Sequence, residues 1–394
     1  MAGSKSVVQL SGSTPLIMPL MALLVFIGLA APANAFETSA REALLVDMST
    51  GTTLFEKNAD QLMPPASMSK MMTTYMVFDG LKKGELKLDD TFTVSANAWE
   101  KGGAASGGST MFLNPNEVVS LEDLIRGIVV QSGNDACIVV AEGLAGSEEA
   151  FAEEMTQKGK EIGLRNTNFK NATGLPHPDH MTTARDLATL ARRTIEDSPE
   201  YYSYYAETEF THNGIRQGNR NPLLYKDMGA DGLKTGHTSE AGYGLTASAT
   251  QGDRRLILVL NGLPSMKSRF EESERMMSWG FREFDTYALF EPGEQVSEAE
   301  VWLGKEKTVP LVVPEGLKVT LSREGRKDMQ VKVGYDGPIR APIIEGDSVA
   351  TLTITVPDIS PIEVPLAAGA TVEEMGYMGK LAVALKQLVS SATN

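Results

Sequence analysis

The sequence contains one cysteine, Cys137, and only four histidines among its 394 residues. A single cysteine cannot form a disulfide within the chain, so the packing of side chains must stabilise the fold. Cys137 lies in the apolar run Ala136–Ala141, which favours a small buried hydrophobic residue over a nucleophile. The histidines are scattered and show no H-E-x-x-H spacing, so the sequence indicates no zinc site, and we expect neither a metal nor a cofactor.

The chain also contains fewer basic than acidic residues. The chain has 36 Lys and Arg against 51 Asp and Glu, a formal net charge of -15. Because a basic face is what neutralises phosphates, this balance argues against nucleic acid as a partner. The composition, 42% hydrophobic and 22% charged, is ordinary for a globular protein, and the length predicts two domains.

No apolar run is long enough to span a bilayer as a stable helix. The longest, Leu20–Ala31, follows a stretch in which Lys5 is the only charge. The small residues Ala33 and Ala35 then give the pattern that a signal peptidase accepts. We therefore predict that residues 1–35 are a signal peptide and that the mature chain is exported in a bacterium; an uncleaved anchor is the alternative.

Strand-like and helix-like segments follow one another from residue 36 to 290. Strands at both ends with helices between them predict an α/β (α+β) domain, in which a mixed sheet is covered by helices. We expect strands within Glu42–Asp60 and at Gly232–Thr235, Tyr243–Thr250 and Arg254–Asn261, and helices at Ser67–Gly80, from Ser120, and at Asp135–Gly143, Ala184–Glu196 and Ser265–Tyr287.

The character of the chain changes near Glu291. Short β-like runs punctuated by Pro and Gly predict a small all-β domain over residues 291–370. Residues 371–394 predict a terminal amphipathic helix that opens with the capping box Thr371–Glu374. Such a helix can anchor the chain at a membrane surface, dock on the β domain, or contact another copy, and the sequence leaves these alternatives open.

The first string with chemical meaning is Ser67-Met-Ser-Lys70. A serine hydroxyl is a poor nucleophile until a base takes its proton, and residues three apart on a helix share a face. Lys70 can be that base if burial or a neighbouring cation lowers its pKa. Roughly one S-x-x-K is expected by chance in a chain of this length, so this string needs support from others.

The second string is Ser132-Gly-Asn134, between two expected helices, where Gly133 can allow a sharp turn. Ser132 can relay a proton to a leaving nitrogen, and Asn134 can hold a substrate amide. Ser95 and Asn97 also fit S-x-N, but they do not lie at an expected helix junction.

The third string is Lys234-Thr-Gly236 at the end of an expected strand. A fixed ammonium from Lys234 with the hydroxyl of Thr235 suits a substrate carboxylate. Gly236 allows a ligand backbone to approach closely and pair beside the strand. Three strings in this order match the S-x-x-K, S-D-N and K-T-G set of penicillin-binding proteins and class A β-lactamases.

Further segments of the sequence strengthen this match. The segments PPASMSKMMT, QSGNDAC, NRNPLLY, DGLKTGHTSEAGYGLTASATQGDRRL and SWGFREF resemble the low-molecular-mass penicillin-binding proteins of the serine D-alanyl-D-alanine carboxypeptidase family, the type of penicillin-binding proteins 5 and 6. The resemblance implies a β-lactamase/transpeptidase-like fold and removal of the terminal D-alanine from peptidoglycan stem pentapeptides in the periplasm. It also implies covalent inhibition by β-lactams and a C-terminal helix at the outer face of the inner membrane.

The resemblance also assigns roles. It makes Ser67 the nucleophile, Lys70 its base, Ser132 the proton relay and Asn134 a substrate clamp. By the same resemblance, Lys234 and Thr235 receive the substrate carboxylate. The backbone N–H groups of Ser67 and His237 form the oxyanion hole, and Arg269 lies near the carboxylate site. His237 would then act through its backbone, so its imidazole need not be catalytic.

Three alternatives share parts of this pattern. A class A β-lactamase needs a carboxylate on a loop after the second string, and the stretch Ile162–Ile195 has no glutamate. An endopeptidase that cuts D-Ala–diaminopimelate cross-links would use the same chemistry. A non-catalytic wall-binding protein is the third alternative, and the retention of all three strings argues against it.

Overall fold

The computed structural model describes residues 5–9, 36–357 and 360–383, so the expected signal-peptide run Leu20–Ala31 and its cleavage site lie outside the described residues. The chain divides into two compact units, Phe36–Glu283 and Phe284–Asn394, with residues 1–35 assigned to the second. Within that unit, Lys5–Gln9 forms strand β1 and pairs antiparallel with β15, Gln330–Asp336. Residues 1–35 stay predicted as a signal peptide, and five of them take part in this pairing. It covers what would otherwise be an open sheet edge.

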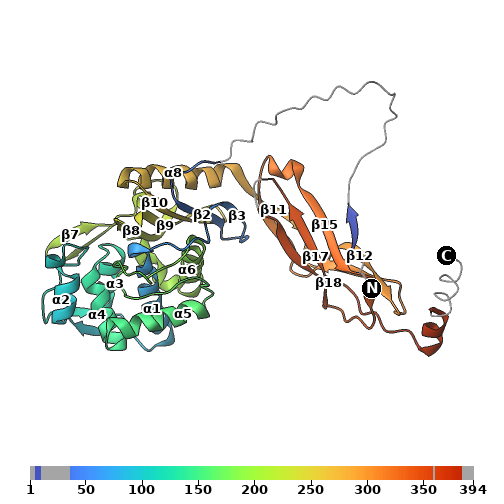
Figure 1. Cartoon of the computed structure of the whole chain (residues 1–394), viewed down its shortest axis with the longest axis horizontal. Helices are drawn as coiled ribbons and strands as arrows, with labels where there is room; N and C mark the ends of the chain where they lie inside the picture. Colours follow the sequence, from blue (N-terminus) through green and yellow to red (C-terminus); the bar gives the residue numbers. More distant parts are fainter. Residues whose placement is uncertain (1–4, 10–35, 358–359, 384–394) are drawn as a thin grey trace, which may run out of the picture. The chain divides into compact units, whose positions relative to one another are not determined.

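A five-stranded sheet forms the centre of the first unit, in the order β3-β2-β10-β9-β8, and every pairing is antiparallel (Figure 1). The expected strands and the α/β fold class are thus confirmed, but the sheet is antiparallel throughout rather than mixed. The central strand β10 is buried along most of its length, because helices α6 and α8 both contact it. The strands are β2 Glu42–Asp47, β3 Thr53–Lys57, β8 Ala230–Thr238, β9 Gly242–Gln251 and β10 Arg254–Leu263.

Helices pack around α1 and α4 to form the rest of this unit. Caps set several helix starts: Ser120 accepts a hydrogen bond from the Asp123 backbone N–H at α3, as its capping box predicts. Cys137 on α4 is fully buried, as expected. The α-helices are α1 Lys70–Lys83, α2 Ala96–Gly102, α3 Leu121–Val129, α4 Asn134–Ala145, α5 Glu148–Glu161, α6 Ala184–Asp197, α7 Pro199–Tyr202 and α8 Met266–Glu283.

Short elements complete the first unit. They are the 3₁₀ turns η1 Ala66–Ser69, η2 Ala104–Ser106, η3 Ser203–Ala206 and η4 Pro222–Tyr225, and the strands β4 Thr91–Thr93, β5 Val118–Ser120, β6 Glu209–His212 and β7 Ile215–Gly218. The turn η1 contacts both β8 and β9, so the segment that carries Ser67 rests on the edge of the sheet.

The second unit is the expected all-β domain, with a seven-stranded sheet in the order β1-β15-β17-β18-β13-β12-β16 and a pair of strands, β11 and β14. Its apolar side chains form a separate core. Its strands after β1 are β11 Phe284–Phe290, β12 Glu294–Trp302, β13 Thr308–Val313, β14 Leu317–Ser322, β15, β16 Ile339–Arg340, β17 Ser348–Thr355 and β18 Ile362–Ala368, with the 3₁₀ turn η5 Gly325–Asp328.

Two expected boundaries are wrong. The helix predicted to reach Tyr287 ends at Glu283, because Phe284–Phe290 pairs with β14; the second unit therefore begins at Phe284 rather than at residue 291. The predicted capping box at Thr371–Glu374 opens no helix. Instead, Val372 pairs with Ile343 and is buried in the β core, so these residues continue the sheet domain.

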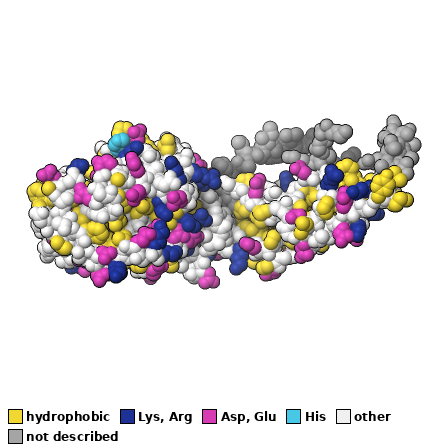
Figure 2. All heavy atoms as spheres, turned by 90° about the horizontal axis from the view of Figure 1, so that it is seen from below, with side chains coloured by type: hydrophobic (Ala, Val, Ile, Leu, Met, Phe, Trp, Pro, Cys, Tyr) yellow, Lys and Arg dark blue, Asp and Glu magenta, His cyan; other side chains and the backbone are white. Residues whose placement is uncertain are grey.

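Helical structure in the tail begins later, over residues 377–383, and residues 384–394 of the predicted helix lie outside the described chain. No helix in the described part of the chain has the length and apolar character to cross a bilayer. Figure 2 shows acidic and basic side chains interspersed on the face in view, without a broad basic field.

Candidate active site

Ser67 lies in η1, the short turn that leads directly into α1, and Lys70 is the first residue of that helix. The spacing of three residues brings the two side chains together, as predicted: Lys70 Nζ donates a hydrogen bond to Ser67 Oγ at 3.0 Å. Ala66 just before them has a left-handed backbone (φ 47°), a conformation that costs a non-glycine residue energy and is common at functional sites.

The surroundings of Lys70 suit a base. Its ammonium is fully buried and also donates to Asn134 Oδ1 at 2.8 Å and to the Thr173 carbonyl at 2.5 Å. Burial, helped by the positive charge of Arg220, lowers the pKa of Lys70 to about 8 against the opposing effects of Cys137 and Asp135. A substantial fraction of the amine is therefore neutral near physiological pH.

The second string lies between α3 and α4, as predicted, but the turn is made differently. Ser132 itself adopts the left-handed conformation (φ 60°), whereas Gly133 has φ -58°. Gly133 is needed for packing, because a Cβ there would approach Asp135 Oδ1 at 2.9 Å and Met111 N at 3.0 Å. Ser132 Oγ is buried and has no hydrogen-bond partner among the described residues, so it is free to bond a ligand.

Asn134 has a second function that the sequence did not reveal. We expected it to hold the substrate, but its side-chain oxygen also accepts from Lys70 and so positions the base. Its own backbone N–H donates to the Ser109 carbonyl at 2.8 Å. The next residue, Asp135, accepts hydrogen bonds from Thr110 and Met111, which secures the loop carrying Ser109.

The third string lies on β8, which is an edge strand of the sheet. Lys234 and Thr235 are 2% and 5% exposed. Within the described ranges, the Lys234 ammonium makes a long hydrogen bond to the Thr235 carbonyl at 3.4 Å. Burial holds the pKa of Lys234 well below its usual range, and the charges of Lys70 and Arg220 add to the effect. The Lys70 and Lys234 amines therefore lie close enough for the charge of Lys70 to lower the pKa of Lys234.

Gly236 has a packing role that the sequence did not reveal. A Cβ at this position would lie 3.0 Å from the Pro65 carbonyl and 3.1 Å from the Ala66 Cβ. The small residue therefore allows β8 to pack against η1, which carries Ser67. Close packing of the protein itself thus favours a small residue here, and the approach of a ligand backbone to Gly236 stays a prediction.

His237 on β8 and Arg269 on α8 both lie near the ring of one tyrosine. The His237 imidazole packs against the ring of Tyr243 at a tilt of 31°, with centroids 3.9 Å apart, and the Arg269 guanidinium lies 5.8 Å from the centroid of the same ring. Arg269 is 5% exposed, and its Nε has no partner in the described chain. Burial lowers its pKa to about 10, with a further effect from Arg220.

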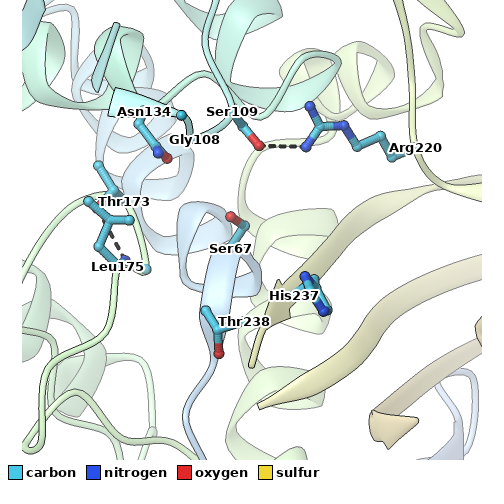
Figure 3. Close-up of a pocket in the computed structure, with 11 residues that line it drawn as sticks. Ser67, Gly108, Ser109, Asn134, Thr173, Leu175, Arg220, His237 and Thr238 are labelled. Carbon is cyan, nitrogen blue, oxygen red and sulfur yellow. Dashed lines mark hydrogen bonds between the residues drawn. The ribbon is translucent and has the colours of Figure 1, made fainter. Parts of the chain in front are cut away.

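An open cavity of about 390 Å³ brings these elements together (Figure 3). Ser67 points into it, facing Asn134 and Ser109 across the gap. Its walls include Ser67 of the first string and Asn134 of the second, but on β8 they include His237 and Thr238, just beyond the third string. Several other lining residues were missed by the sequence reasoning. The lining residues are Ser67, Gly107, Gly108, Ser109, Asn134, Thr173, Gly174, Leu175, Arg220, His237 and Thr238.

The sequence analysis did not single out Arg220 or the loop that contains Thr173, and both line the cavity. Arg220 donates a 2.5 Å hydrogen bond to Ser109 Oγ, and burial lowers its pKa. It adds a cation to those of Lys234 and Arg269. Asn171 Oδ1 accepts from the backbone N–H groups of Thr173 and Gly174, which fixes the loop that receives Lys70.

Gly174 provides a direct test of how tightly this loop is confined. It has φ +79°, and a Cβ there would come 1.9 Å from the Ala66 carbonyl. Gly146 has the same φ with nothing within 4 Å, so it is a matched control. We expect Gly146→Ala to lose about 1 kcal/mol of unfolding free energy from backbone strain. Gly174→Ala should lose at least about 2 kcal/mol because a collision is added. Equal losses in thermal melts would contradict the tight packing.

Comparison with known proteins places this site in a family. The family model described as D-alanyl-D-alanine carboxypeptidase matches residues 29–264, and the model for the penicillin-binding protein 5 C-terminal domain matches residues 284–374. The chain belongs to the D-alanyl-D-alanine carboxypeptidase family. The family and the fold class predicted from the three strings are thus confirmed, and the enzyme is a serine hydrolase of the penicillin-binding protein type.

Individual relatives agree with this assignment. The D-alanyl-D-alanine carboxypeptidase DacC of Escherichia coli is 42% identical over 351 residues, 88% of each chain. The crystal structure of penicillin-binding protein 5 from Haemophilus influenzae is 36% identical, with a TM-score of 0.74, and covers 87% of this chain and all of that one. Penicillin-binding protein D2 of Listeria monocytogenes, solved in an ampicillin-bound form, is 29% identical with a TM-score of 0.55 and covers 64% of this carboxypeptidase.

Proposed function

We propose that Ser67 attacks the carbonyl carbon between the last two residues of a peptidoglycan stem pentapeptide that ends in D-Ala-D-Ala. A bond forms from Ser67 Oγ to this carbon, and the carbon–nitrogen bond to the terminal D-alanine breaks. The Ser67 proton passes through Lys70 to the departing amine, and water later hydrolyses the acyl-enzyme. The observation that carries the proposal is the 3.0 Å contact between the Ser67 hydroxyl and a buried lysine whose pKa is lowered.

The remaining groups support the same reaction. We assign proton relay to the Ser132 hydroxyl, which is buried and without a partner in the described chain. The edge strand β8 offers backbone groups to an extended peptide, with Lys234 and Thr235 beside its terminal carboxylate. Arg269 and the newly found Arg220 increase the positive charge there. The backbone N–H groups of Ser67 and His237 are assigned to the oxyanion hole.

β-Lactams are proposed to acylate the same serine. Family membership supports this assignment, and the related Listeria protein has been solved in ampicillin-bound and cefotaxime-bound forms. A class A β-lactamase mechanism receives no such support, because none of the residues that line the cavity is a carboxylate. Asp186, on α6, is engaged by the backbone N–H groups of Arg165 and Asn166.

The location of the enzyme follows from its substrate. We assign it to the periplasm, with the C-terminal tail at the outer face of the inner membrane. Support comes from Tyr377, Met378 and Leu381 in the tail helix, which are 81%, 76% and 44% exposed. Apolar side chains of this size on a short helix suit the headgroup region of a bilayer.

One digestion experiment tests the reaction itself. Purified pentapeptide and cross-linked muropeptides are incubated side by side with the enzyme, and free D-alanine and cleaved dimers are measured. Release of D-alanine from pentapeptide is the expected result. Cleavage of dimers alone would instead support the endopeptidase alternative.

The rate of acylation should depend on pH through Lys70. Its lowered pKa of about 8 means that the amine is protonated, and unable to accept a proton, below this value. The second-order rate constant for penicillin acylation should therefore rise with pH through a midpoint near about 8 and level off roughly one pH unit higher. Rates measured from pH 6 to 10 check this. A midpoint near about 10.4, that of an ordinary lysine, would contradict the assignment of Lys70 as base.

A further inference from the structure

A second, smaller hollow adjoins the cavity that contains Ser67. It has a volume of about 10 Å³, enough for roughly one water-sized group. The two spaces share three wall residues, Gly174, Leu175 and Thr238, so the hollow continues the same cleft. The residues that line only the hollow are Pro64, Pro65, Ala66, Pro176, His177, His180 and Glu240.

His180 lines this hollow, and its ring holds a hydrogen-bond donor without a partner in the described chain. Its side chain is 2% exposed, and Nδ1 accepts from the Lys170 backbone N–H at 3.2 Å. Burial lowers the pKa of His180 to about 4, so the ring is neutral at physiological pH and Nε2 carries its proton. Nε2 has no hydrogen-bond partner within the described ranges. Since a buried donor left unpaired is costly, an acceptor in the hollow would be bound favourably.

Glu240 places a negative charge at the mouth of the hollow. It lies in the turn between β8 and β9 and is exposed, and no hydrogen bond or ion pair joins its carboxylate to another residue of the described chain. The turn is held in place, because Ala241 donates its backbone N–H to Thr238 Oγ1 at 3.0 Å and receives a hydrogen bond from Arg41 at 3.2 Å.

The direction of the bound peptide follows from the proposed function, on which this inference rests. The terminal carboxylate lies at Lys234 and Thr235, and the reacting carbonyl lies between Ser67 and His237. The residues that precede D-Ala-D-Ala must then extend past Thr238 toward Glu240, with Leu175 on the opposite wall. The third residue of the stem peptide is therefore the one beside the hollow.

We propose that the hollow and Glu240 form a subsite for the side-chain head group of that third residue, an ammonium and a carboxylate on one carbon, as in diaminopimelate. Glu240 pairs with the ammonium at the mouth. One carboxylate oxygen enters the hollow and accepts the hydrogen bond of His180 Nε2. A lysine in the third position would make only the first contact, and Nε-acetyl-lysine would make neither.

Synthetic pentapeptides test the two contacts separately. The third residue is diaminopimelate, lysine or Nε-acetyl-lysine, and kcat/KM for D-alanine release is measured with each. We expect wild-type enzyme to prefer lysine over acetyl-lysine by about two- to fivefold, the range for an exposed ion pair. We expect diaminopimelate to exceed lysine by about tenfold, because a buried donor bonds a charged acceptor.

The variants should each remove one preference. Glu240→Gln should bring lysine and acetyl-lysine to equal kcat/KM, and His180→Phe should bring diaminopimelate down to lysine. Glu153→Gln, an exposed position on α5 outside both cavities, is the charge-matched control and should change neither ratio. Should His180→Phe fail to fold in a thermal melt, the wild-type and Glu240→Gln ratios still decide the question.

Two failures can be told apart. Equal kcat/KM for all three peptides in the wild-type enzyme, with D-alanine still released, would overturn the subsite and leave the proposed function intact. No release from any peptide, with penicillin acylation of Ser67 retained, would overturn the proposed peptide substrate instead.

Discussion

Ser67→Ala should abolish D-alanine release and leave the protein folded. The alanine keeps the backbone of η1 but removes the hydroxyl that accepts a hydrogen bond from Lys70 and that attacks the substrate. Without this hydroxyl no acyl-enzyme can form. Folding is expected to survive because Ser67 is partly exposed and, among the described residues, its hydroxyl has no hydrogen bond other than that from Lys70. Release of D-alanine from pentapeptide over hours, by chromatography, is the measurement.

A neighbouring serine provides the control for that variant. Ser69 lies in the same turn, is fully buried, and donates its hydroxyl to the Ala66 carbonyl at 3.0 Å, away from Lys70. Ser69→Ala should lose about 1 kcal/mol of stability from the lost hydrogen bond yet still release D-alanine. Release by the Ser67 variant, at a rate close to that of the Ser69 variant, would refute the nucleophile.

Lys70→Met should slow acylation by penicillin about 10²- to 10⁴-fold, the range for loss of a general base. Methionine is similar in length and apolar, so it fills the fully buried space. It leaves Asn134 Oδ1 and the Thr173 carbonyl without their donor, which destabilises the fold, but it also removes a buried amine. These effects oppose each other, and we expect a small net change in melting temperature.

The acylation rate and its pH dependence distinguish a lost base from a disturbed site. Lys87→Met, at an exposed position, controls for loss of a charge and should acylate at the wild-type rate. The slow residual acylation of the Lys70 variant should also lose its rise toward pH 8. A rate within tenfold of wild type would show that another group accepts the Ser67 proton.

The features of this protein that could be predicted best from the sequence are those set by residues close together in the chain. Ser67 and Lys70 were paired correctly because a separation of three residues determines a shared face at a helix start. Strands such as β9 and β10 were found because their apolar runs flank a short polar turn. These are local properties of the chain.

The parts that were missed depend on distant contacts. The Thr173 carbonyl receives Lys70, but any residue has a carbonyl, so no sequence pattern marks it. Arg220 stands alone between two asparagines, and only the folded chain brings it to Ser109. The helix expected to reach Tyr287 ended early because pairing of β11 with β14 overrides the local preference.

The conformations of Ser132 and Gly133 in the second string also could not be predicted from the sequence. Gly133 looked like the residue that turns the chain, yet Ser132 takes the left-handed conformation. The reason is tertiary: the position of Gly133 lies against Asp135 and Met111, so a small residue is required there for space. A sequence shows that a glycine is present, but it does not show which of its two properties is used.

The central claim is that one serine, beside one buried lysine, forms the covalent intermediate. Mass spectrometry of the full chain after brief exposure to penicillin, followed by proteolytic peptide mapping, tests it most directly. The account predicts a single adduct of the mass of the drug on the peptide that contains Ser67. An adduct on any other peptide, or an unmodified protein, would contradict it.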